Sequence, residues 1–351
     1  MRILIVSDAW FPQTNGVVNT LAQTAAWLGR FGHEVRLATP RDFRTVACPT
    51  YPEIRMALHP MPGLARCIEA FRPHAVHIAT EGPIGLAARR YCVKRGWQFT
   101  TSYHTQFPLY LRSRWPIPLA VSYAALRWFH GAARSCMVST QGIYTELLAR
   151  GFKNLARWSR GVDTTLFRPR DKGFLSLPRP IAAYVGRLAV EKNVDAFLQM
   201  PWQGTKIVLG DGPERQRLQA QYPDAIYFGF RFGEDLAAHL AASDVLVFPS
   251  RTDTFGLVNL EAMACGVPVA AFPVTGPVEV VEDGVTGALD SSLGKAAERA
   301  IRADPRACRD RALQSSWRDC TRQFERNLVA CRPGLDAPAM PSREVIDGAL
   351  S

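Results

Sequence analysis

The stretch that decides the fold is Ser250-Arg-Thr-Asp-Thr-Phe-Gly-Leu-Val-Asn-Leu-Glu-Ala-Met-Ala-Cys-Gly-Val-Pro268. A short apolar run at 244–249 precedes it and is typical of a buried parallel strand. Apolar residues then recur at helical spacing over 257–264, and Gly266 is placed to end that helix. The sequence therefore predicts a helix N-terminus near Gly256, at the carboxyl end of a strand. Free N–H groups at such an end suit a phosphate.

Two carboxylates flank this predicted anion site. Asp253 lies in the loop, and Glu261 lies eight positions later, about one and a half turns into the helix. A phosphate held by the helix amides would have an acidic acceptor on either side, suited to hydroxyls of a ribose and of a sugar. The alternative is that Asp253 caps the helix and Glu261 is a solvated surface residue.

The same loop resembles the signature of the retaining, nucleotide-sugar-dependent glycosyltransferases of family 4. Their pattern is two glutamates separated by seven residues; Asp253 and Glu261 keep that separation, with Asp in place of the first Glu. The resemblance implies the α/β GT-B fold, in which two Rossmann-like, doubly wound parallel-sheet domains face each other across a cleft. It also implies that the first acid contacts the transferred sugar and the second contacts the donor ribose.

The chain of 351 residues is too long for one ordinary core and indicates two domains. Apolar strands alternate with Gly-containing loops and helices in both halves, as in βαβ units. The closing helix crosses back to the first domain by resemblance. The predicted organisation is a first domain at 1–169, a linker at 170–180, a second domain at 181–312, a closing helix at 313–331 and a frayed tail at 332–351.

Composition indicates a globular cytoplasmic protein. Hydrophobic residues make up 47% and charged residues 21%, and no apolar run approaches the roughly 20 residues of a membrane-spanning helix. The N-terminus predicts a strand rather than a signal peptide. Eight scattered cysteines favour reduced thiols over a disulfide framework or a zinc site.

The net charge of +11 is distributed unevenly. Residues 1–170 carry 22 Lys/Arg against 8 Asp/Glu, whereas residues 171–351 carry 20 against 23. A basic first half suggests an anionic partner, either nucleic acid or an anionic bilayer surface. An arginine-rich composition inherited from a GC-rich genome is the alternative.

Two loops of the first half carry candidate ligand groups. The loop Asn15-Gly16 follows the first strand and permits close approach of a phosphate, so Gly16 is a candidate donor contact. His104 follows a predicted strand at 99–102. Spacing alone also fits a structural hydrogen bond for His104; the family resemblance implies contact with the transferred sugar.

The segment 109–134 combines arginines with Tyr110, Trp115, Tyr123, Trp128 and Phe129. This combination suggests a helix lying in a membrane surface. An ordinary domain helix whose aromatic residues fill the core is the alternative.

The second half carries the candidate diphosphate site. Arg187 and Lys192 lie in one loop after a strand and could both bind a pyrophosphate; they match the family's diphosphate-binding pair. The expected catalytic residues are His104, Arg187, Lys192 and Asp253. The expected donor-binding residues are Gly16, Arg187, Lys192, Gly210, Phe230, Thr254, Phe255, Gly256, Leu257 and Glu261.

The resemblance is to the subgroup of bacterial diacylglycerol glycosyltransferases and GDP-mannose-dependent α-mannosyltransferases. It implies retaining transfer of a hexosyl group from a UDP- or GDP-linked sugar. Two cationic side chains and the lack of an Asp-x-Asp motif predict that no metal or other cofactor is needed. The basic first domain and the Arg/aromatic segment favour a lipid acceptor such as diacylglycerol at the inner face of the plasma membrane. A mannosyltransferase acting on phosphatidylinositol or a saccharide is the enzymatic alternative. There are two non-enzymatic alternatives. One is a nucleotide-sugar-binding protein that has lost catalysis. The other is a basic nucleic-acid-binding protein, although the sequence contains no recognisable nucleic-acid-binding module. The sequence leaves the oligomeric state open.

Overall fold

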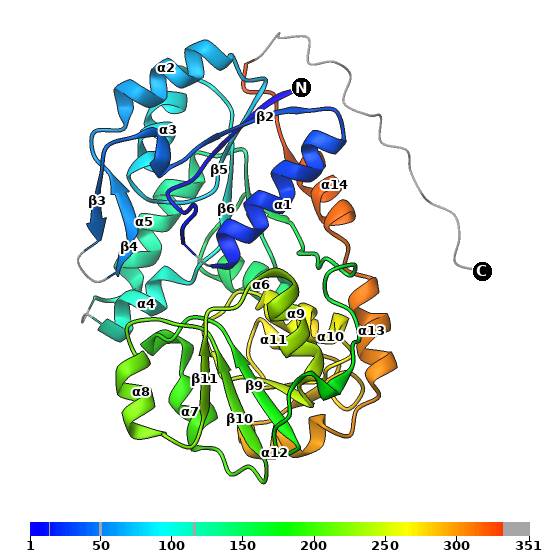
Figure 1. Cartoon of the computed structure of the whole chain (residues 1–351). Coiled ribbons are helices and arrows are strands. Elements are labelled where there is room, and N and C mark those ends of the chain that lie inside the picture. Colours follow the sequence, from blue (N-terminus) through cyan, green and yellow to red (C-terminus); the bar gives the residue numbers. More distant parts are fainter. Residues whose placement is uncertain (14, 49–50, 115–116, 333–351) are drawn as a thin grey trace.

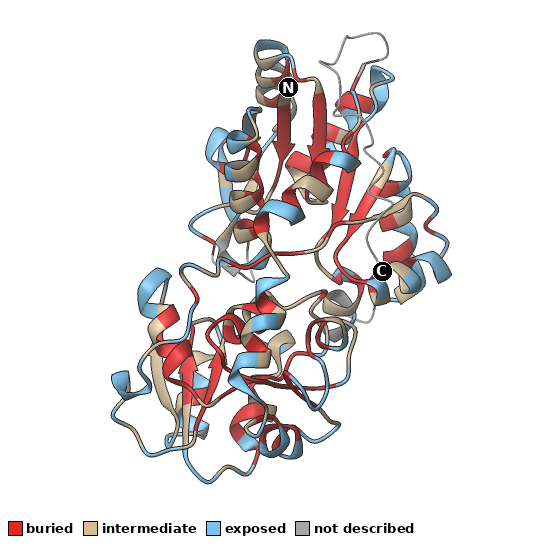
Figure 2. Cartoon of the chain, turned by 90° about the vertical axis from the view of Figure 1, so that its right-hand side faces the viewer, coloured by how far each residue is buried: buried red, intermediate tan, exposed pale blue. Residues whose placement is uncertain are grey.

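The computed structural model describes residues 1–13, 15–48, 51–114 and 117–332, so the expected tail lies outside them except for Arg332. Within these residues the chain forms two parallel six-stranded sheets and one antiparallel hairpin (Figure 1). The central strands of both sheets consist largely of buried residues (Figure 2), whereas the edge strands β2, β8 and β11 are mostly exposed or half-buried. This arrangement confirms the predicted α/β GT-B class with two Rossmann-like domains.

The first domain is built around a sheet of strand order β2-β1-β5-β6-β7-β8. Its order reverses between β1 and β5, the point at which doubly wound sheets place ligands. The strands are β1 (Arg2–Val6), β2 (Glu34–Ala38), β5 (Ala75–Ile78), β6 (Thr100–Tyr103), β7 (Ser135–Val138) and β8 (Leu155–Arg157), with the hairpin β3 (Thr45–Cys48) and β4 (Tyr51–Ala57). The helices are α1 (Gly16–Arg30), α2 (Met61–Phe71), α3 (Pro83–Lys94), α4 (Phe107–Arg114), α5 (Leu119–Gly131) and α6 (Gln141–Ala149), with the 3-10 turn η1 (Pro40–Asp42).

The second domain has the strand order β11-β10-β9-β12-β13-β14, which reverses between β9 and β12. The carboxyl ends of β9 and β12 are therefore the expected ligand position. The strands are β9 (Ile181–Val185), β10 (Thr205–Leu209), β11 (Ile226–Gly229), β12 (Val245–Phe248), β13 (Val269–Ala271) and β14 (Gly287–Leu289). The helices are α7 (Val194–Gln199), α8 (Arg215–Gln221), α9 (Gly233–Ala242), α10 (Leu257–Ala264), α11 (Pro277–Val280), α12 (Leu293–Ala300) and α13 (Pro305–Leu313), with the turns η2 (Lys172–Phe174) and η3 (Val190–Lys192).

The chain returns to the first domain through α14 (Trp317–Asn327), which lies beside α1 (Figure 1). Ser316 caps this helix, because its Oγ accepts a hydrogen bond of 3.0 Å from the Asp319 N–H. Trp317 and Phe324 pack into the first domain's core with Trp158. The last helix therefore joins the two domains.

The Arg/aromatic segment forms α4 and α5. Tyr123 and Phe129 of α5 are buried in the core, whereas Trp128 is 58% exposed and Val121 is 60% exposed. Trp115 lies outside the described residues. In the described part of the chain, no helix combines the length and the apolar character needed to cross a membrane.

Candidate active site

The loop between β12 and α10 has the shape that the sequence predicts. Gly256 is the N-cap of α10 with φ +81°, and a Cβ on it would lie 2.8 Å from the Phe248 ring. A residue with a side chain would therefore be strained here. No side chain caps the helix, so its first N–H groups and the positive end of its dipole are available to an anion.

Lys192 lies against this loop. Its Nζ donates to Asp253 Oδ1 at 2.5 Å. The Asn193 side-chain amide donates to the Pro249 carbonyl at 3.0 Å, and the Thr252 hydroxyl contacts the Glu191 carbonyl at 3.4 Å. The loops that follow β9 and β12 thus bring Lys192 and Asp253 together at the strand-order reversal.

Burial alone would lower the pKa of Lys192. The Asp253 carboxylate and the Tyr110 hydroxyl outweigh this effect and hold that pKa above its ordinary value. Lys192 is therefore a fixed cation at neutral pH. Burial also raises the pKa of Glu261 to about 7. The Glu261 carboxylate makes no hydrogen bond or ion pair to the described residues, so it can accept hydroxyls.

Three other predicted donor contacts lie at the same end of the second sheet. Arg187 is in the loop after β9, where its carbonyl accepts the Tyr184 hydroxyl at 2.7 Å. A Cβ on Gly210 would lie 1.8 Å from the Gly186 carbonyl oxygen, so close packing of two loops already requires this glycine. Phe230 follows β11, is 40% exposed and stacks on Phe232. The donor roles of these residues stay predictions.

The first domain contacts the loop between β12 and α10, called the donor loop below because donor binding is predicted there, at Thr254. The Thr254 hydroxyl donates to the His104 carbonyl at 2.8 Å. In return, the Thr254 carbonyl accepts the hydroxyls of Ser139 and Thr140 at 3.1 and 3.2 Å. The strand ends of β6 and β7 therefore contact the loop that precedes α10.

The N-terminus of α1 also faces the N-terminus of α10. Asn15 caps α1 through its Oδ1, which accepts the Val18 N–H at 3.0 Å. A Cβ on Gly16 would lie 3.6 Å from Leu257 Cδ1. Leu257 packs against the first domain's core, whereas Phe255 packs against the second domain's core. The predicted residues of the two halves are thus brought to one junction.

His104 lies beneath this junction, after β6. Its Nδ1 is 3.1 Å from Arg160 Nη2, and its ring packs edge-on against Trp158. Its Nε2 is buried and has no hydrogen-bond partner. Burial, followed by the charge of Arg160, holds the pKa of His104 well below its ordinary value.

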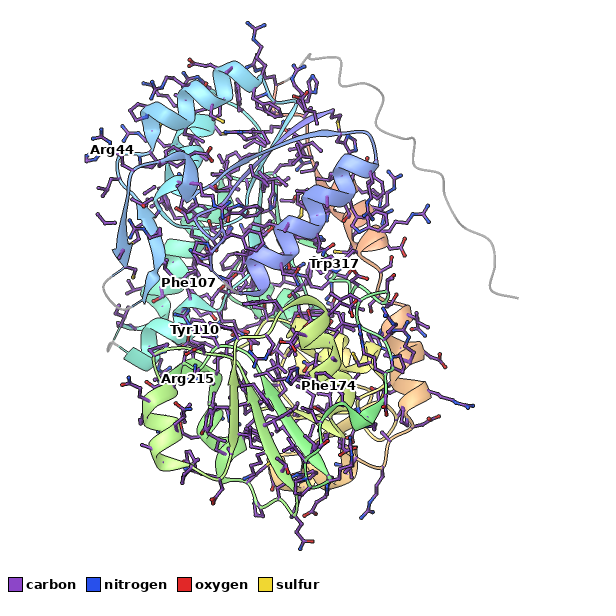
Figure 3. All side chains as sticks on the ribbon, viewed as in Figure 1. Arg44, Phe107, Tyr110, Phe174, Arg215 and Trp317 are labelled. Atoms are coloured by element: carbon purple, nitrogen blue, oxygen red, sulfur yellow. The ribbon has the colours of Figure 1, made fainter. Side chains whose placement is uncertain are left out.

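Sequence reasoning missed four residues at the junction. Tyr110 of α4 lies where the first domain meets the second (Figure 3). It interacts with Lys192 and Thr252 of the second domain. Arg160 contacts His104. The side chain of Asn259 in α10 is buried with neither its Nδ2 nor its Oδ1 paired. In the sequence, the signal that could have identified it is an Asn among the apolar residues of the predicted helix, because a buried amide needs hydrogen-bond partners.

The fourth missed residue is Glu279 of α11. Its Oε1 accepts the Gly142 N–H of α6 at 2.5 Å, and its Oε2 accepts Arg157 Nη2 at 3.2 Å. Both partners belong to the first domain. Glu279 is therefore a second polar bridge between the domains.

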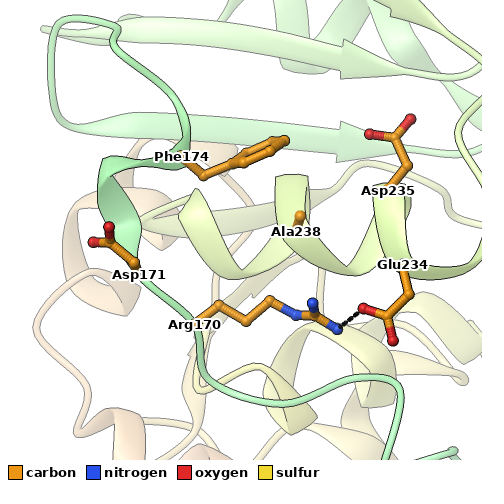
Figure 4. Close-up of a pocket in the computed structure, with 6 residues that line it drawn as sticks. All are labelled: Arg170, Asp171, Phe174, Glu234, Asp235 and Ala238. Atoms are coloured by element: carbon orange, nitrogen blue, oxygen red, sulfur yellow. Dashed lines mark ion pairs between the residues drawn. The ribbon is translucent and has the colours of Figure 1, made fainter.

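A hollow of about 530 Å³ lies away from this junction, between η2 and α9 (Figure 4). Phe174 borders it, and Arg170 Nη2 pairs with Glu234 Oε2 at 2.5 Å across it. Its lining comes from the linker and α9 rather than from the donor loop. As for metals, the described residues contain no group of three or more His, Cys, Asp or Glu placed to hold an ion.

Comparison with known proteins agrees with this geometry. A family model described as "Glycosyltransferase Family 4" matches residues 14–166, and one described as "Glycosyl transferases group 1" matches residues 179–303. A GDP-mannose-dependent alpha-mannosyltransferase of Mycobacterium tuberculosis is 30% identical, over 82% of this chain and 83% of its own. Sulfoquinovosyl transferase SQD2 of Arabidopsis thaliana is 28% identical, over 82% of this chain and 62% of its own.

Solved structures share the fold at lower identity. Sucrose-phosphate synthase from Thermosynechococcus elongatus superposes with a TM-score of 0.74 at 22% identity, covering 93% of this chain and 97% of its own. Anabaena HepE, solved in complex with UDP and glucose, gives a TM-score of 0.69 at 17% identity, covering 93% and 98%. Fold, junction and relatives together define a two-domain glycosyltransferase. The chain belongs to glycosyltransferase family 4.

Proposed function

We propose that the protein is a retaining, metal-independent hexosyltransferase that moves a sugar from a nucleoside diphosphate to a hydroxyl of a membrane lipid such as diacylglycerol. The observation that carries this proposal is the junction itself. The second domain contributes Lys192, Asp253 and the α10 N-terminus. The first domain contributes His104, whose carbonyl accepts a hydrogen bond of 2.8 Å from the hydroxyl of Thr254 in the second domain. The residues that we assign to the diphosphate thus lie beside the residue that we assign to the transferred sugar.

Charge grows on the leaving β-phosphate as the sugar becomes oxocarbenium-like. The contact with Asp253 holds Lys192 in place before the donor binds, and helix geometry fixes the N–H groups at the start of α10. We propose that these groups, joined by Arg187 from the loop after β9, stabilise that charge with little reorganisation. The ammonium of Lys192 has three donor hydrogens. We propose that it keeps its contact with Asp253 and adds one to the phosphate. Glu261 accepts the ribose hydroxyls, and Asp253 accepts a sugar hydroxyl.

Retention is explained by attack of the acceptor on the face from which the diphosphate leaves. Two cations supplied by the protein take the charge-neutralising role that a divalent metal takes in other transferases. The test is the anomeric configuration of the product by NMR, together with activity in EDTA. An inverted product would contradict the retaining mechanism. Loss of activity in EDTA that Mg²⁺ or Mn²⁺ restores would contradict metal independence.

GDP-mannose is the first donor to test, because several relatives that align with 82% of this chain are GDP-mannose-dependent alpha-mannosyltransferases. A UDP-linked sugar, UDP-glucose or UDP-glucuronate, is the second. The UDP-linked donor stays a candidate because of the sulfoquinovosyl transferase relative and the HepE complex with UDP-glucose. Thermal stabilisation by GDP or by UDP separates the two before any transfer assay.

A lipid acceptor is supported by the first domain. This half carries the excess positive charge, and Trp128 is exposed with the Arg89 guanidinium 3.8 Å from its ring centroid. Arginine beside an exposed tryptophan is a common composition of membrane-surface helices. We place the protein in the cytoplasm, docked on the anionic inner face of the plasma membrane.

The deciding experiment incubates radiolabelled GDP-mannose, UDP-glucose and UDP-glucuronate with vesicles that contain diacylglycerol or phosphatidylinositol. We expect a labelled, organic-soluble product with one donor, absent with Lys192→Ala and retained with the exposed-site control Lys295→Ala. A product only on soluble saccharides would overturn the lipid acceptor. No product with any donor, combined with stabilisation by duplex DNA rather than by a nucleotide, would overturn the function.

A further inference from the structure

Arg160 is a buried cation without a carboxylate partner. It is 5% exposed, its Nη1 donates to the Trp158 and Ser159 carbonyls at 2.7 and 2.9 Å, and its guanidinium lies 4.4 Å from the Trp158 ring centroid. No carboxylate among the described residues forms an ion pair with it. Burying an unpaired charge costs free energy. The two carbonyl hydrogen bonds engage Nη1 alone and leave the role of Nη2 open.

The contact with His104 supplies that role. Arg160 Nη2 lies 3.1 Å from His104 Nδ1. A guanidinium can only donate hydrogen bonds, so Nδ1 must be the accepting, unprotonated nitrogen. The ring proton of the neutral imidazole therefore resides on Nε2. This Nε2–H is buried and has no acceptor, although the His104 backbone lies against Thr254 of the donor loop.

We propose that Arg160 is a positioning residue that fixes His104 as its neutral Nε2–H tautomer, so that His104 donates a hydrogen bond to a hydroxyl of the transferred sugar. This inference rests on the proposed function. His104 thus carries an unpaired buried donor, and its own carbonyl contacts Thr254 in the loop between β12 and α10. A hydroxyl of a sugar bound at the junction would satisfy this donor. The hydroxyl gains a partner that water cannot easily replace in the closed junction.

The neutral state matters because positive charge develops on the sugar in the transition state. An imidazolium at His104 would oppose that charge. The ionisable groups around His104 are Arg160, His77 of β5 and His130 of α5, and each, after burial itself, disfavours protonation of the ring. Glu81 lies behind His130 and pairs with it at 3.1 Å. Removing Arg160 removes the nearest cation and frees Nδ1 to take a proton.

The test uses Arg160→Met, which is apolar and cannot donate, and Arg160→Lys, whose longer side chain ends in an ammonium that can still donate to Nδ1. Arg302→Gln, at an exposed site in the second domain, is the matched control. The first readout is the imidazole ¹H–¹⁵N spectrum of substrate-free enzyme, with His104 assigned by loss of its signals in His104→Asn. We expect one protonated Nε2 and one unprotonated Nδ1 in the wild type, unchanged from pH 7.5 to 5.5. In Arg160→Met we expect a mixture of the two neutral tautomers, and in Arg160→Lys the wild-type pattern.

The second readout is kcat with saturating donor. We expect Arg160→Met to lower kcat about 10- to 100-fold, with KM changed less than threefold. We expect Arg160→Lys to restore part of kcat. A wild-type spectrum with Nδ1–H or an imidazolium would overturn the inference, even if Arg160→Met fails to fold. Mixed tautomers with unchanged kcat would overturn the link to catalysis. No transfer with any donor would overturn the proposed function and the sugar contact, whereas the spectrum alone would still decide the tautomer.

Discussion

The two strands that lead into the junction differ in character. In the second domain β12 is Val-Leu-Val-Phe and entirely apolar, so its loop presents ligand groups through backbone shape, helix dipole and fixed cations. In the first domain β6 is Thr-Thr-Ser-Tyr, equally buried. Its hydroxyls bond to histidines: Thr100 and Ser102 to His77 at 2.9 and 2.8 Å, and Thr101 to His130 at 2.9 Å.

The difference separates two tasks. A diphosphate is a strong, constant anion, and amides with a permanently charged lysine suit it. Sugar hydroxyls need directed donors, and the polar network around β6 controls which atoms carry protons. Burial lowers the pKa of His77 to about 3. Burial would also lower the pKa of His130, but its contacts with Cys136 and Glu81 raise it to about 10. We therefore expect the second domain to set the charge of the site and the first to set its proton arrangement.

Replacing the fixed cation should have the largest effect. Lys192→Ala removes the phosphate contact that we propose and leaves Asp253 without this cation, which adds repulsion beside a bound diphosphate. We expect kcat/KM to fall about 10³-fold, near the upper effect of losing one preorganised donor. Steady-state kinetics against Lys295→Ala measures it. A loss below tenfold would mean that the second domain does not set the charge of the site.

Glu261 is the one titratable exception in the second domain. Its pKa of about 7 means that the protonated fraction grows as the pH falls below 7, and a protonated carboxyl loses one acceptor for the ribose hydroxyls. We expect kcat/KM for the donor to fall on this acid side, approaching tenfold per pH unit. Glu261→Gln should lower the pH-independent value of kcat/KM about 10- to 50-fold and should make kcat/KM less dependent on pH on the acid side. An acid-side fall that persists unchanged in Glu261→Gln would assign it to the first domain instead.

The second domain's side of the junction was largely predictable. Spacing and glycine placement located the α10 N-terminus at Gly256, one residue before the helix begins at Leu257. Turn chemistry is local, so the sequence displays it. The alternation of strands and helices likewise predicted two parallel sheets. The hairpin β3–β4 and the short strand β8 had no comparable periodic signal.

The first domain's side was less predictable, because its contacts join residues that are distant in sequence. Arg160 lies 56 residues from His104, and Glu279 lies 137 residues from Gly142. Neither pairing can be recognised from the spacing of residues along the chain. The aromatic residues of 109–134 were also ambiguous: α5 buries Tyr123 and exposes Trp128. Amphipathic spacing does not say which aromatic faces outward.

Weakening the contacts of Glu279 with the first domain should have a smaller effect than removing the positive charge of Lys192. Glu279→Gln keeps an acceptor for the Gly142 N–H but loses the ion pair with Arg157. The junction should close less favourably, and we expect kcat/KM to fall about tenfold, or 1.4 kcal/mol, with GDP or UDP affinity in the second domain nearly unchanged. Isothermal titration and kinetics against the exposed control Glu298→Gln check both. Equal losses of nucleotide affinity and kcat/KM would contradict a bridge between domains.

The smallest effect concerns stability. His77 has a folded pKa of about 3 against an ordinary value of 6.5, so the unfolded chain binds the extra proton first as the pH falls. Stability is therefore lost progressively from pH 6.5 toward 3, by about 1.4 kcal/mol at pH 5.5 from this group. His77→Gln cannot titrate, so its free energy of unfolding should depend less steeply on pH, whatever its absolute stability, whereas the exposed-site variant His59→Asn should keep the wild-type slope. Urea unfolding from pH 7.5 to 5 measures these slopes. Identical slopes in wild type and His77→Gln would show that the network around β6 does not carry the acid sensitivity, and would remove the distinction between a proton-setting first domain and a charge-setting second one.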